Sequence, residues 1–555
     1  MSWIFNLIRG RPKYTGEISK LRDDRLDVGE REAIEETLKF GTSLRENINM
    51  IKAAVGPSPD VAIREMRIGQ GRYEAAVVYI QDLVDKGLTE SLLRMLGLGT
   101  LETPVGKAPR GRILEELKDR LIASVAVNSV RTFTEAWEDL TKGHALVILD
   151  GDGEPLTCGV QGYKTRTPEE PPAEVVVRGA REGFVESIAT NISLLRRWIR
   201  TPNLWIEPFT LGHLTRTPVA IAYIKGLASE ELVQEVRQRI SRIETDSILG
   251  SGYVEEFIQD TPFTLFPLVL RTERPDRVAG NLLDGKVAVF TENTPFVLIV
   301  PFDYGSLFQA PDDYHEPVPL VTALTVIRLL AFWGSLLLPG AFVAVLTFHQ
   351  QLFPTQLLLK ITGDRAGIPF PVVAEVFAME LVFELLREAG LRLPRAVGSA
   401  VTIVGALVLG EAAINAGFVS PSVIIVVAMT AISSFVLPTF SFDVAARLLR
   451  FVFIILGGVL GLFGIQLGFL TTIVLLTGLR SFGLPYFKPM GPMILADWKD
   501  SHFRAWAWMR ITRPKLAGSR EPIRAPRGQM PRPGLEKEET EKGSGRSDRG
   551  GAKRQ

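Results

Sequence analysis

The chain has 555 residues, enough for several domains, and its 63 Lys and Arg residues nearly balance 62 Asp and Glu residues, which leaves a net charge of +1. This balance gives no electrostatic reason to expect nucleic acid as a partner. The single cysteine, Cys158, excludes an internal disulfide and a thiolate zinc cluster, and the five histidines lack metal-ligand spacing, so we expect no metal and no cofactor.

Charge and hydropathy divide the chain into soluble and membrane parts. Residues 317–479 hold nearly all the long apolar runs, whereas the flanking sequence is charged. This pattern predicts a multi-domain membrane protein, with a soluble N-terminal α/β domain that includes a helical lobe, followed by an α-helical transmembrane domain. The expected sections are a mostly helical lobe at 1–130, an α/β lobe at 131–316, a helical membrane domain at 317–495 and a basic disordered tail at 496–555.

The soluble part combines helical and strand patterns. Residues 15–100 carry apolar residues at helical spacing among charges, and residues 144–160 resemble a hairpin around Gly151-Asp152-Gly153. From 175 to 300 strands and helices alternate, which is typical of a small α/β domain. We expect strands at 175–177, 204–212, 219–224, 287–290 and 296–300, and helices at 183–199 and 229–243.

Motifs for common enzyme chemistry are missing from the sequence. It has no GxxxxGK[ST] loop, no GxGxxG after a strand, no GxSxG and no HExxH. A nucleotide-driven pump and an intramembrane metalloprotease are therefore not expected, and we predict no catalytic residues.

The membrane half contains four apolar runs of about 20 residues or more, the length that a membrane helix needs. They are 321–348, 397–419, 422–440 and 449–479. The last run could form one tilted helix or a tight hairpin around Gly464–Gly468, and Pro339 and Pro438 are expected to kink their helices. Small residues that would allow close helix packing recur in this run, at Gly457, Gly461, Gly464 and Gly468.

A fifth segment, 371–390, carries four glutamates, of which Glu380, Glu384 and Glu388 form one stripe at helical spacing. It could be an amphipathic surface helix with a solvated acidic face. Charge placement favours a crossing instead. Without it, the loop with Arg387, Arg392 and Arg395 and the loop with Arg447 and Arg450 would both lie outside, against the positive-inside tendency. We therefore expect five or six membrane segments.

Carboxylates on a crossing helix cannot face lipid without a cost of a few kcal/mol each. In a ring of identical subunits, Glu380 and Glu384 would form rings of negative charge that favour cations. Val373 and Phe377 would then form the constriction of the pore. Two polar residues of the run 397–419, Glu411 and Asn415, could face the same interior or make a single interhelical hydrogen-bond contact.

Several long motifs occur in order along the chain. Three of them are 294-TPFVLIVPFDYGSLFQAPDDYHEP-317, 364-DRAGIPFPVVAEVFAMELVFELLREAGLRLP-394 and 398-GSAVTIVGALVLGEAAINAGFVSP-421. Together with 178–187, 191–199, 271–288 and 479–492, they resemble the GerA spore germination protein family, the A subunits of nutrient germinant receptors. The resemblance covers roughly residues 35–495. A SpoVA-operon relative shares this architecture, so the paralogue stays open.

The resemblance implies a multi-pass protein of the inner spore membrane with its soluble domain on the core side. It implies a complex with a transporter-like, nutrient-binding B subunit and a lipoprotein C subunit. It also implies a homo-oligomer, expected to be a pentamer, that forms a nutrient-gated channel for monovalent cations. The segment 369–386 corresponds to the pore-lining helix of the family.

Two alternatives remain: a SpoVA-associated paralogue that amplifies germination, and a non-conducting scaffold that couples partner subunits. A secondary transporter would show an internal repeat of membrane segments, and the sequence has none that we recognise.

Overall fold

The structure is a computed structural model of the chain. It describes residues 20–531, apart from residues 22, 69–72, 99–117, 119–125, 163–170, 172–173, 175, 177, 394–404, 406–407, 502 and 516–518. The first part of the run 397–419 and the tail from 532 therefore fall on residues outside the described set. Of the strand expected at 175–177 only Val176 is described, and it lies in no strand.

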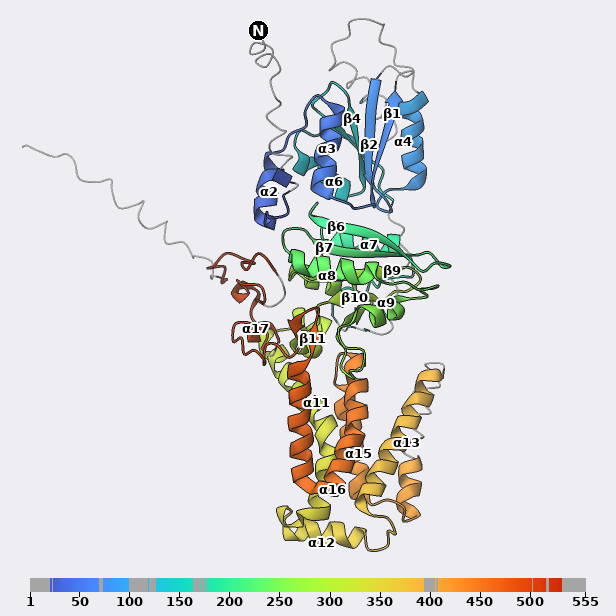
Figure 1. Ribbon diagram of the computed structural model, residues 1–555, viewed down its shortest axis with the longest axis vertical. Helices are drawn as coiled ribbons and strands as arrows, with labels where there is room; N and C mark the ends of the chain where they lie inside the picture. The colour runs from blue at the N-terminus through green and yellow to red at the C-terminus, as the bar shows by residue number, and fades with distance from the viewer. Residues whose placement is uncertain are drawn as a thin grey trace, which may run out of the picture.

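The first lobe is a five-stranded antiparallel sheet with helices on both faces (Figure 1). Its elements are α2 (Val28–Thr37), α3 (Leu44–Val55), β1 (Val61–Ile68), β2 (Tyr73–Ile80), α4 (Lys86–Leu98), β3 (Val127–Ser129), α6 (Phe133–Thr141), β4 (His144–Leu149) and β5 (Leu156–Gly159). Successive residues of β2 point to opposite faces, so Val78 packs in the core under α3 and α6 while Val77 packs in the core under α4.

The helical prediction for residues 15–100 is wrong for β1 and β2, which pair in register from Val61 opposite Ile80 to Ile68 opposite Tyr73. The β2 run is buried on both faces, and such a continuous apolar run cannot be told from a buried helix by periodicity. The hairpin expected at 144–160 is confirmed, because β4 pairs with β5.

The second lobe repeats the strand order of the first. Its elements are α7 (Ile188–Trp198), β6 (Leu204–Leu211), β7 (Thr217–Ile224), α8 (Glu230–Ser241), α9 (Ser251–Ile258), β8 (Leu270–Thr272), α10 (Pro275–Leu283), β9 (Val287–Thr291) and β10 (Val297–Val300). The spatial order β6-β7-β9-β10-β8 corresponds position by position to β1-β2-β4-β5-β3. The strands expected at 204–212, 219–224, 287–290 and 296–300 and both expected helices are confirmed.

Buried polar contacts join the two lobes. Arg196 of α7 donates to Asp60, just before β1, with 2.7 Å between Nε and Oδ2, and the Arg196 side chain is fully buried. Trp205 of β6 donates its indole N–H to the carbonyl of Ala54 at 3.1 Å. Because a buried charge is costly when its partner is lost, these contacts fix the lobes in one orientation.

Glu35 of α2 lies buried at the same interface. Burial raises the pKa of Glu35 to about 8, although Arg31 acts in the opposite direction. Because the ordinary value is 4.5, folding takes up a proton, and stability falls as the pH rises from 4.5 towards 8.

Glu35→Gln should therefore make the protein more stable at pH 8, by as much as roughly 5 kcal/mol from linkage, with little effect at pH 4.5. Thermal unfolding of the full chain in detergent across this pH range would measure the effect. Glu36→Gln, at the exposed neighbouring position, is the control and should leave the profile unchanged. Equal pH profiles for Glu35→Gln and the parent would contradict a buried, protonated Glu35.

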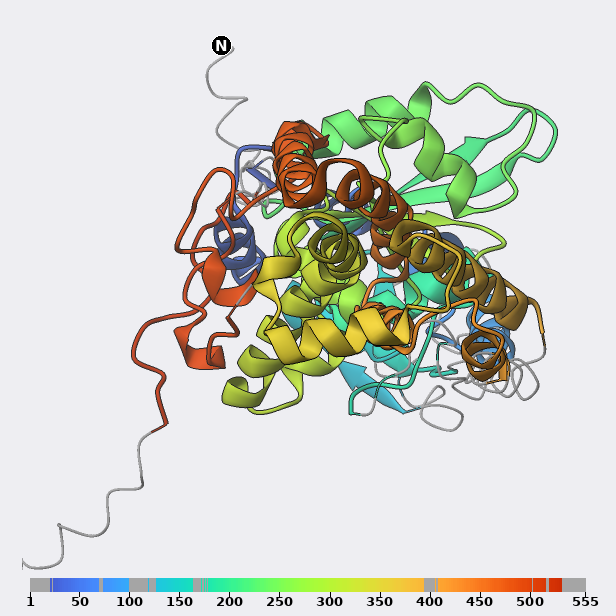
Figure 2. The same cartoon turned by 90° about the horizontal axis from the view of Figure 1, so that it is seen from below.

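Long helices extend from the second lobe, and the short α12 crosses their far end (Figures 1 and 2). The elements are η1 (Tyr304–Phe308), η2 (Pro311–Tyr314), α11 (Val318–Phe348), η3 (Gln350–Leu352), α12 (Thr355–Asp364), α13 (Val372–Arg392), α15 (Pro421–Phe435) and α16 (Phe440–Gly478). By length and composition, α11 and α16 could each cross a membrane. The expected total of five or six membrane segments stays a prediction.

Helix α16 folds back on itself at Gly461, where the backbone has φ +63° and ψ −147°. A Cβ at Gly468 would lie 2.9 Å from Cε1 of Phe453, so the two halves lie side by side. The run 449–479 thus forms a hairpin, one of its two expected forms, but the turn lies at Gly461 rather than around Gly464–Gly468. Pro339 lies inside α11, whereas Pro438 lies in the connection between α15 and α16 and does not kink a helix.

The four glycines of this run all lie at close contacts. A Cβ at Gly457 would lie 2.3 Å from the carbonyl oxygen of Gly340 in α11, and one at Gly464 would lie 2.3 Å from the carbonyl oxygen of Leu456. Gly461 provides the turn, and Gly468 contacts the opposite half of the hairpin. The backbones of α11 and α16 therefore approach more closely than side chains would allow.

Gly457→Ala should force α11 and α16 apart and destabilise the helical domain by about 1–3 kcal/mol, the usual cost of overpacking. Gly363→Ala in α12 is the matched control, because a Cβ there meets nothing within 4 Å. The control should be neutral or stabilise the helix by up to about 1 kcal/mol. Unfolding in detergent would measure both, and an equal response would contradict the close contact.

One apolar core continues from the second lobe into the helices. The ring of Phe308 lies 6.0 Å from that of Phe332 in α11, which stacks at 4.3 Å on Phe442 in α16. These residues belong to the same buried cluster as the α7 and α10 face of the second sheet. The second lobe and the helices are therefore packed together.

The C-terminal segment packs beside the second lobe (Figure 1). The backbone N–H of Arg520 donates to Leu227 at 2.9 Å, Arg513 Nε donates to the carbonyl of Leu283 at 3.0 Å, and Arg524 pairs with Asp284 at 2.8 Å. Residues 512–515 and 519–524 thus differ from the disorder expected after 496. Their composition suggested disorder, but the partners that hold them are supplied by the lobe.

Candidate functional site: paired charges between the helices

A stripe of charged residues joins α13 to α16. Glu380 accepts from Arg450, with 2.7 Å between Oε2 and Nη1, and both side chains are buried. One turn along, Glu384 pairs with Arg447. Two glutamates four residues apart on α13 thus pair with two arginines three residues apart on α16. The pairing order shows that the two helices run in opposite directions.

The stripe continues with reversed signs. Arg387 of α13 donates to Asp443 of α16 at 2.7 Å, and Asp443 also lies 3.2 Å from Arg447. Three carboxylates therefore face three guanidinium groups. This neutral arrangement lowers the cost of placing charge among apolar helices.

Two further contacts tie the stripe to the other helices. Arg450 donates Nε to the carbonyl of Ser335 in α11 at 2.8 Å, and Arg387 donates to the hydroxyl of Ser434 in α15 at 2.7 Å. All four long helices thus meet at these charges, and a movement of α13 has to break several charge-assisted hydrogen bonds at once.

Sequence reasoning placed these arginines in loops, and the structure corrects this. Arg387 lies inside α13, and Arg447 and Arg450 lie within α16, which begins at Phe440 rather than 449. Asp443, Arg447 and Arg450 recur at i, i+4 and i+7, the same spacing as Glu380, Glu384 and Arg387. That complementary spacing was the signal that could have revealed the pairing.

The predicted constriction residues also face α16. Val373 approaches Gly458, where an added Cβ would lie 2.5 Å from Val373 Cγ2, and the ring of Phe377 lies 5.1 Å from that of Phe451. The adjacent side of α13 is exposed and includes Leu381 and Leu385. The pore-lining roles of Val373, Phe377, Glu380 and Glu384 stay predictions, and in this single chain all four lie on the packed side.

The other predicted pair lies elsewhere. Glu411 and Asn415 belong to a helical segment before α15, and both are exposed. They therefore do not share a surface with Glu380 and Glu384.

At the far end of α13, Glu375 is buried. It accepts from Arg365 at 2.9 Å and from the backbone N–H and hydroxyl of Ser420 at 3.0 and 3.1 Å. This cluster fastens α13 to the start of α15.

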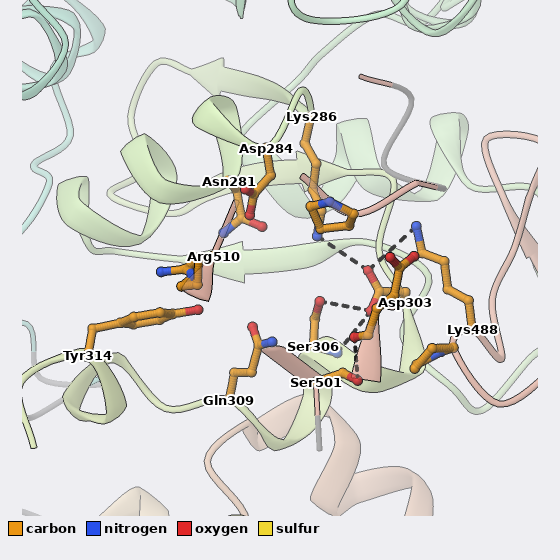
Figure 3. Close-up of a pocket in the computed structure, with 13 residues that line it drawn as sticks. Asn281, Asp284, Lys286, Asp303, Ser306, Gln309, Tyr314, Lys488, Ser501 and Arg510 are labelled. Atoms are coloured by element: carbon orange, nitrogen blue, oxygen red, sulfur yellow. Dashed lines mark hydrogen bonds and ion pairs between the residues drawn. The ribbon is translucent and has the colours of Figure 1, made fainter. Parts of the chain in front are cut away.

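A second charged cluster lies where the helices join the second lobe (Figure 3). Asp303 follows β10 and leads to α11, Lys286 precedes β9, and Lys488 follows the return from α16. The two ammonium groups point at Oδ2 of Asp303 from 3.4 and 3.9 Å, and Ser306 donates its backbone N–H and hydroxyl to Oδ1 at 3.0 and 2.9 Å. A cavity of about 60 Å³ adjoins them, lined also by Arg510.

Burial shapes the protonation of this cluster. Burial acts to raise the pKa of Asp303, but Lys286, Lys488 and Ser306 outweigh it and hold that pKa below its ordinary value. Burial lowers the pKa of Lys488, and Asp303 opposes that change. The cluster therefore depends on a charged Asp303.

The comparisons with known proteins agree on one family. The family model described as Bacillus/Clostridium GerA spore germination protein matches residues 49–516. "Spore germination protein KA" of Bacillus subtilis (strain 168) is 43% identical over 90% of this chain and 91% of its own length. "Spore germination protein GerLA" of Bacillus cereus is 33% identical over 87% of this chain and 97% of its own length.

"Uncharacterized membrane protein YfkQ" of Bacillus subtilis (strain 168) is 36% identical over 85% of this chain and 91% of its own length. Among solved structures, the crystal structure of the N-terminal domain of the A subunit of the Bacillus megaterium spore germinant receptor GerK3 is 34% identical. It matches over 47% of this chain and 95% of its own length, with a TM-score of 0.38. Because the family model and the similar relatives cover most of its length, the chain belongs to the GerA spore germination protein family, as its motifs predicted.

Proposed function

We propose that the chain is the A subunit of a nutrient germinant receptor in the inner spore membrane. In this proposal it assembles with a B subunit that binds the nutrient and a lipoprotein C subunit. Several copies, expected to be five, form a nutrient-gated channel for monovalent cations. Membership of the family and the apolar helices α11 and α16 support this proposal.

The exposed position of Glu411 in a single chain supports an oligomer. Glu411 lies with Asn415 on a segment whose other residues are mostly apolar and exposed, such as Leu409 and Ile414. A carboxylate within a membrane faces a partner helix or water rather than lipid. A ring of copies would supply both, and a ring of carboxylates favours cations.

The paired stripe suggests how such a channel could be held closed. While Glu380 and Glu384 are neutralised by Arg450 and Arg447, they offer no net charge to a passing cation. We infer that nutrient binding in the partner subunit favours a state in which α13 separates from α16. Val373, Phe377, Glu380 and Glu384 would line the pore only in that state.

Ion efflux from liposomes that hold this chain with its B and C partners tests the proposal. We expect added nutrient to release potassium or sodium, and Glu384→Gln to weaken the preference for cations over anions. Glu388→Gln is the matched control, because Glu388 is exposed and pairs with Arg392 within its own helix.

The result can separate two functions. Unchanged selectivity in Glu380→Gln and Glu384→Gln would remove those residues from the pore. No efflux from a folded complex that binds its nutrient would make this chain a non-conducting scaffold.

A further inference from the structure

Large apolar side chains are exposed on α9 and on the loop that follows it. Helix α9 lies on the side of the second lobe that faces the long helices (Figure 1). Phe263 is 98% exposed and Leu265 47% exposed, in the loop 261–267. Tyr253 and Phe257, one turn apart on α9, are 46% and 52% exposed. Exposed apolar groups of this size in one region mark an interaction surface.

The loop 261–267 is fastened at both ends to the chain that leaves α16. Asp260 accepts from the backbone N–H of Phe482, and the hydroxyl of Ser481 donates to the carbonyl of Leu268 at 2.8 Å. Since α16 ends at Gly478, both partners follow the helix by only a few residues.

The loop also contacts the first turns of α16. The ring of Phe266 is buried and lies 6.3 Å from that of Phe442. On α9, Tyr253 lines a cavity of about 440 Å³ together with Pro438 and Thr439, which connect α15 to α16. The exposed apolar groups are therefore held beside both ends of the α16 hairpin.

Helix geometry places these ends at the membrane boundary. The returning half of α16, residues 462–478, rises about 25 Å, close to the roughly 30 Å of a bilayer core. Exposed apolar residues continue to Leu475, and the exposed Arg480 marks the return to water. Ser481 and Phe482, and with them the loop 261–267, then lie at the level of the lipid headgroups.

We propose that the loop 261–267 and the exposed side of α9 insert into the interfacial layer of the lipid bilayer and anchor the second lobe to it. This inference rests on the proposed crossing of the membrane by α11 and α16. Lipid is the occupant because the surface continues directly from membrane-crossing helices, and aromatic side chains favour this layer. Such an anchor would keep the lobe at a fixed height above α13.

Site-specific fluorescence in liposomes tests the anchor. The one native cysteine, Cys158, is buried, and burial raises its pKa to about 12, so an introduced cysteine can be labelled selectively. With an NBD label on Phe263→Cys, we expect strongest quenching by lipids that carry a nitroxide about 5–10 Å below the headgroups. Leu265→Cys repeats the measurement at a second position.

Two further labels serve as controls. Leu88→Cys on α4 lies on the exposed surface of the first lobe and should not be quenched by either shallow or deep nitroxides. Leu470→Cys on the exposed side of α16 should be quenched most by deep nitroxides.

The outcomes separate the anchor from the membrane crossing. Quenching at 470 without quenching at 263 and 265 would overturn the anchor and leave the crossing intact. No quenching at 470 would overturn the crossing itself. A label at 263 that is shielded from water but unaffected by nitroxide lipids would mean that a second protein copy covers this surface, and it would also overturn the lipid anchor.

Discussion

Replacing Arg450 by Met should destabilise the helical domain by about 3–5 kcal/mol, because the change leaves the carboxylate of Glu380 buried without its partner. Arg450 is 2% exposed and Glu380 equally buried, so water cannot replace the lost guanidinium. The hydrogen bond from Arg450 to the carbonyl of Ser335 is lost at the same time. Chemical or thermal unfolding of the purified chain in detergent would measure the loss.

Two companion variants make this prediction specific to the pair. Glu380→Met combined with Arg450→Met removes both charges and should recover most of the stability, because an apolar pair can replace a buried ion pair at little cost. Arg392→Met removes one partner of the exposed pair with Glu388 and should change stability by less than about 1 kcal/mol. If the double variant were as unstable as Arg450→Met, the pairing would not be the reason for the loss.

The same double variant tests whether position 380 lines the pore in the proposed open state. It should fold, yet it lacks the carboxylate that the proposed open state exposes at position 380. Nutrient-triggered efflux with reduced cation preference would fit a pore that exposes this position. Efflux with unchanged preference would leave Glu380 a structural residue.

The sequence was most informative where one physical signal dominated. Strand β6 and helix α8 were predicted because β6 alternates more and less buried residues and α8 is amphipathic. Strand β2 was missed because a strand buried on both faces lacks alternation, and its partner β1, which is mostly half-buried or exposed, was missed with it. The shared topology of the two lobes was also missed, since it lies in the order of strand pairing rather than in sequence similarity.

The charged stripe was half predictable. The spacing of Glu380 and Glu384 predicted the acidic face of α13. The arginines that pair with this face were assigned to a loop because the start of α16 carries the charged residues Asp443, Arg447 and Arg450. A hydropathy window rejects such a helix start, although the charges are neutralised by another helix. Which side of α13 faces α16 depends on tertiary packing, and no local pattern specifies it.

The charged cluster where the helices join the second lobe could not be predicted from the sequence. Lys286, Asp303 and Lys488 are separated by up to about two hundred residues and have ordinary neighbours in sequence. They meet because the lobe, the start of α11 and the return from α16 converge. This convergence makes the cluster a mechanical link, since any displacement of α11 or α16 relative to the lobe must stretch the contacts of Asp303.

Asp303→Asn should therefore be one of the most damaging single changes, with an expected loss of about 3–5 kcal/mol at neutral pH because two buried ammonium groups lose their shared counter-charge. The pKa of Asp303 lies below its ordinary value of 3.8, so its contribution is present above that pH and is lost only as the pH falls through the lower folded value. Unfolding of the full chain at neutral pH would show the loss.

The pH dependence of Asp303→Asn supplies the decisive comparison. Without Asp303, burial should lower the pKa of Lys488 further below its ordinary value of 10.5. As the pH rises, Lys488 then loses its proton in the folded state at a lower pH than in the unfolded state. The stability of the variant should then rise relative to the parent as the pH increases from neutral towards 10. Glu154→Gln, at the exposed pair with Arg131 in the first lobe, is the control and should cost no more than about 1 kcal/mol with no such recovery. A deficit in Asp303→Asn that stays constant over this range would show that lost hydrogen bonds to Ser306, rather than the lost ion pairs with Lys286 and Lys488, cause the damage.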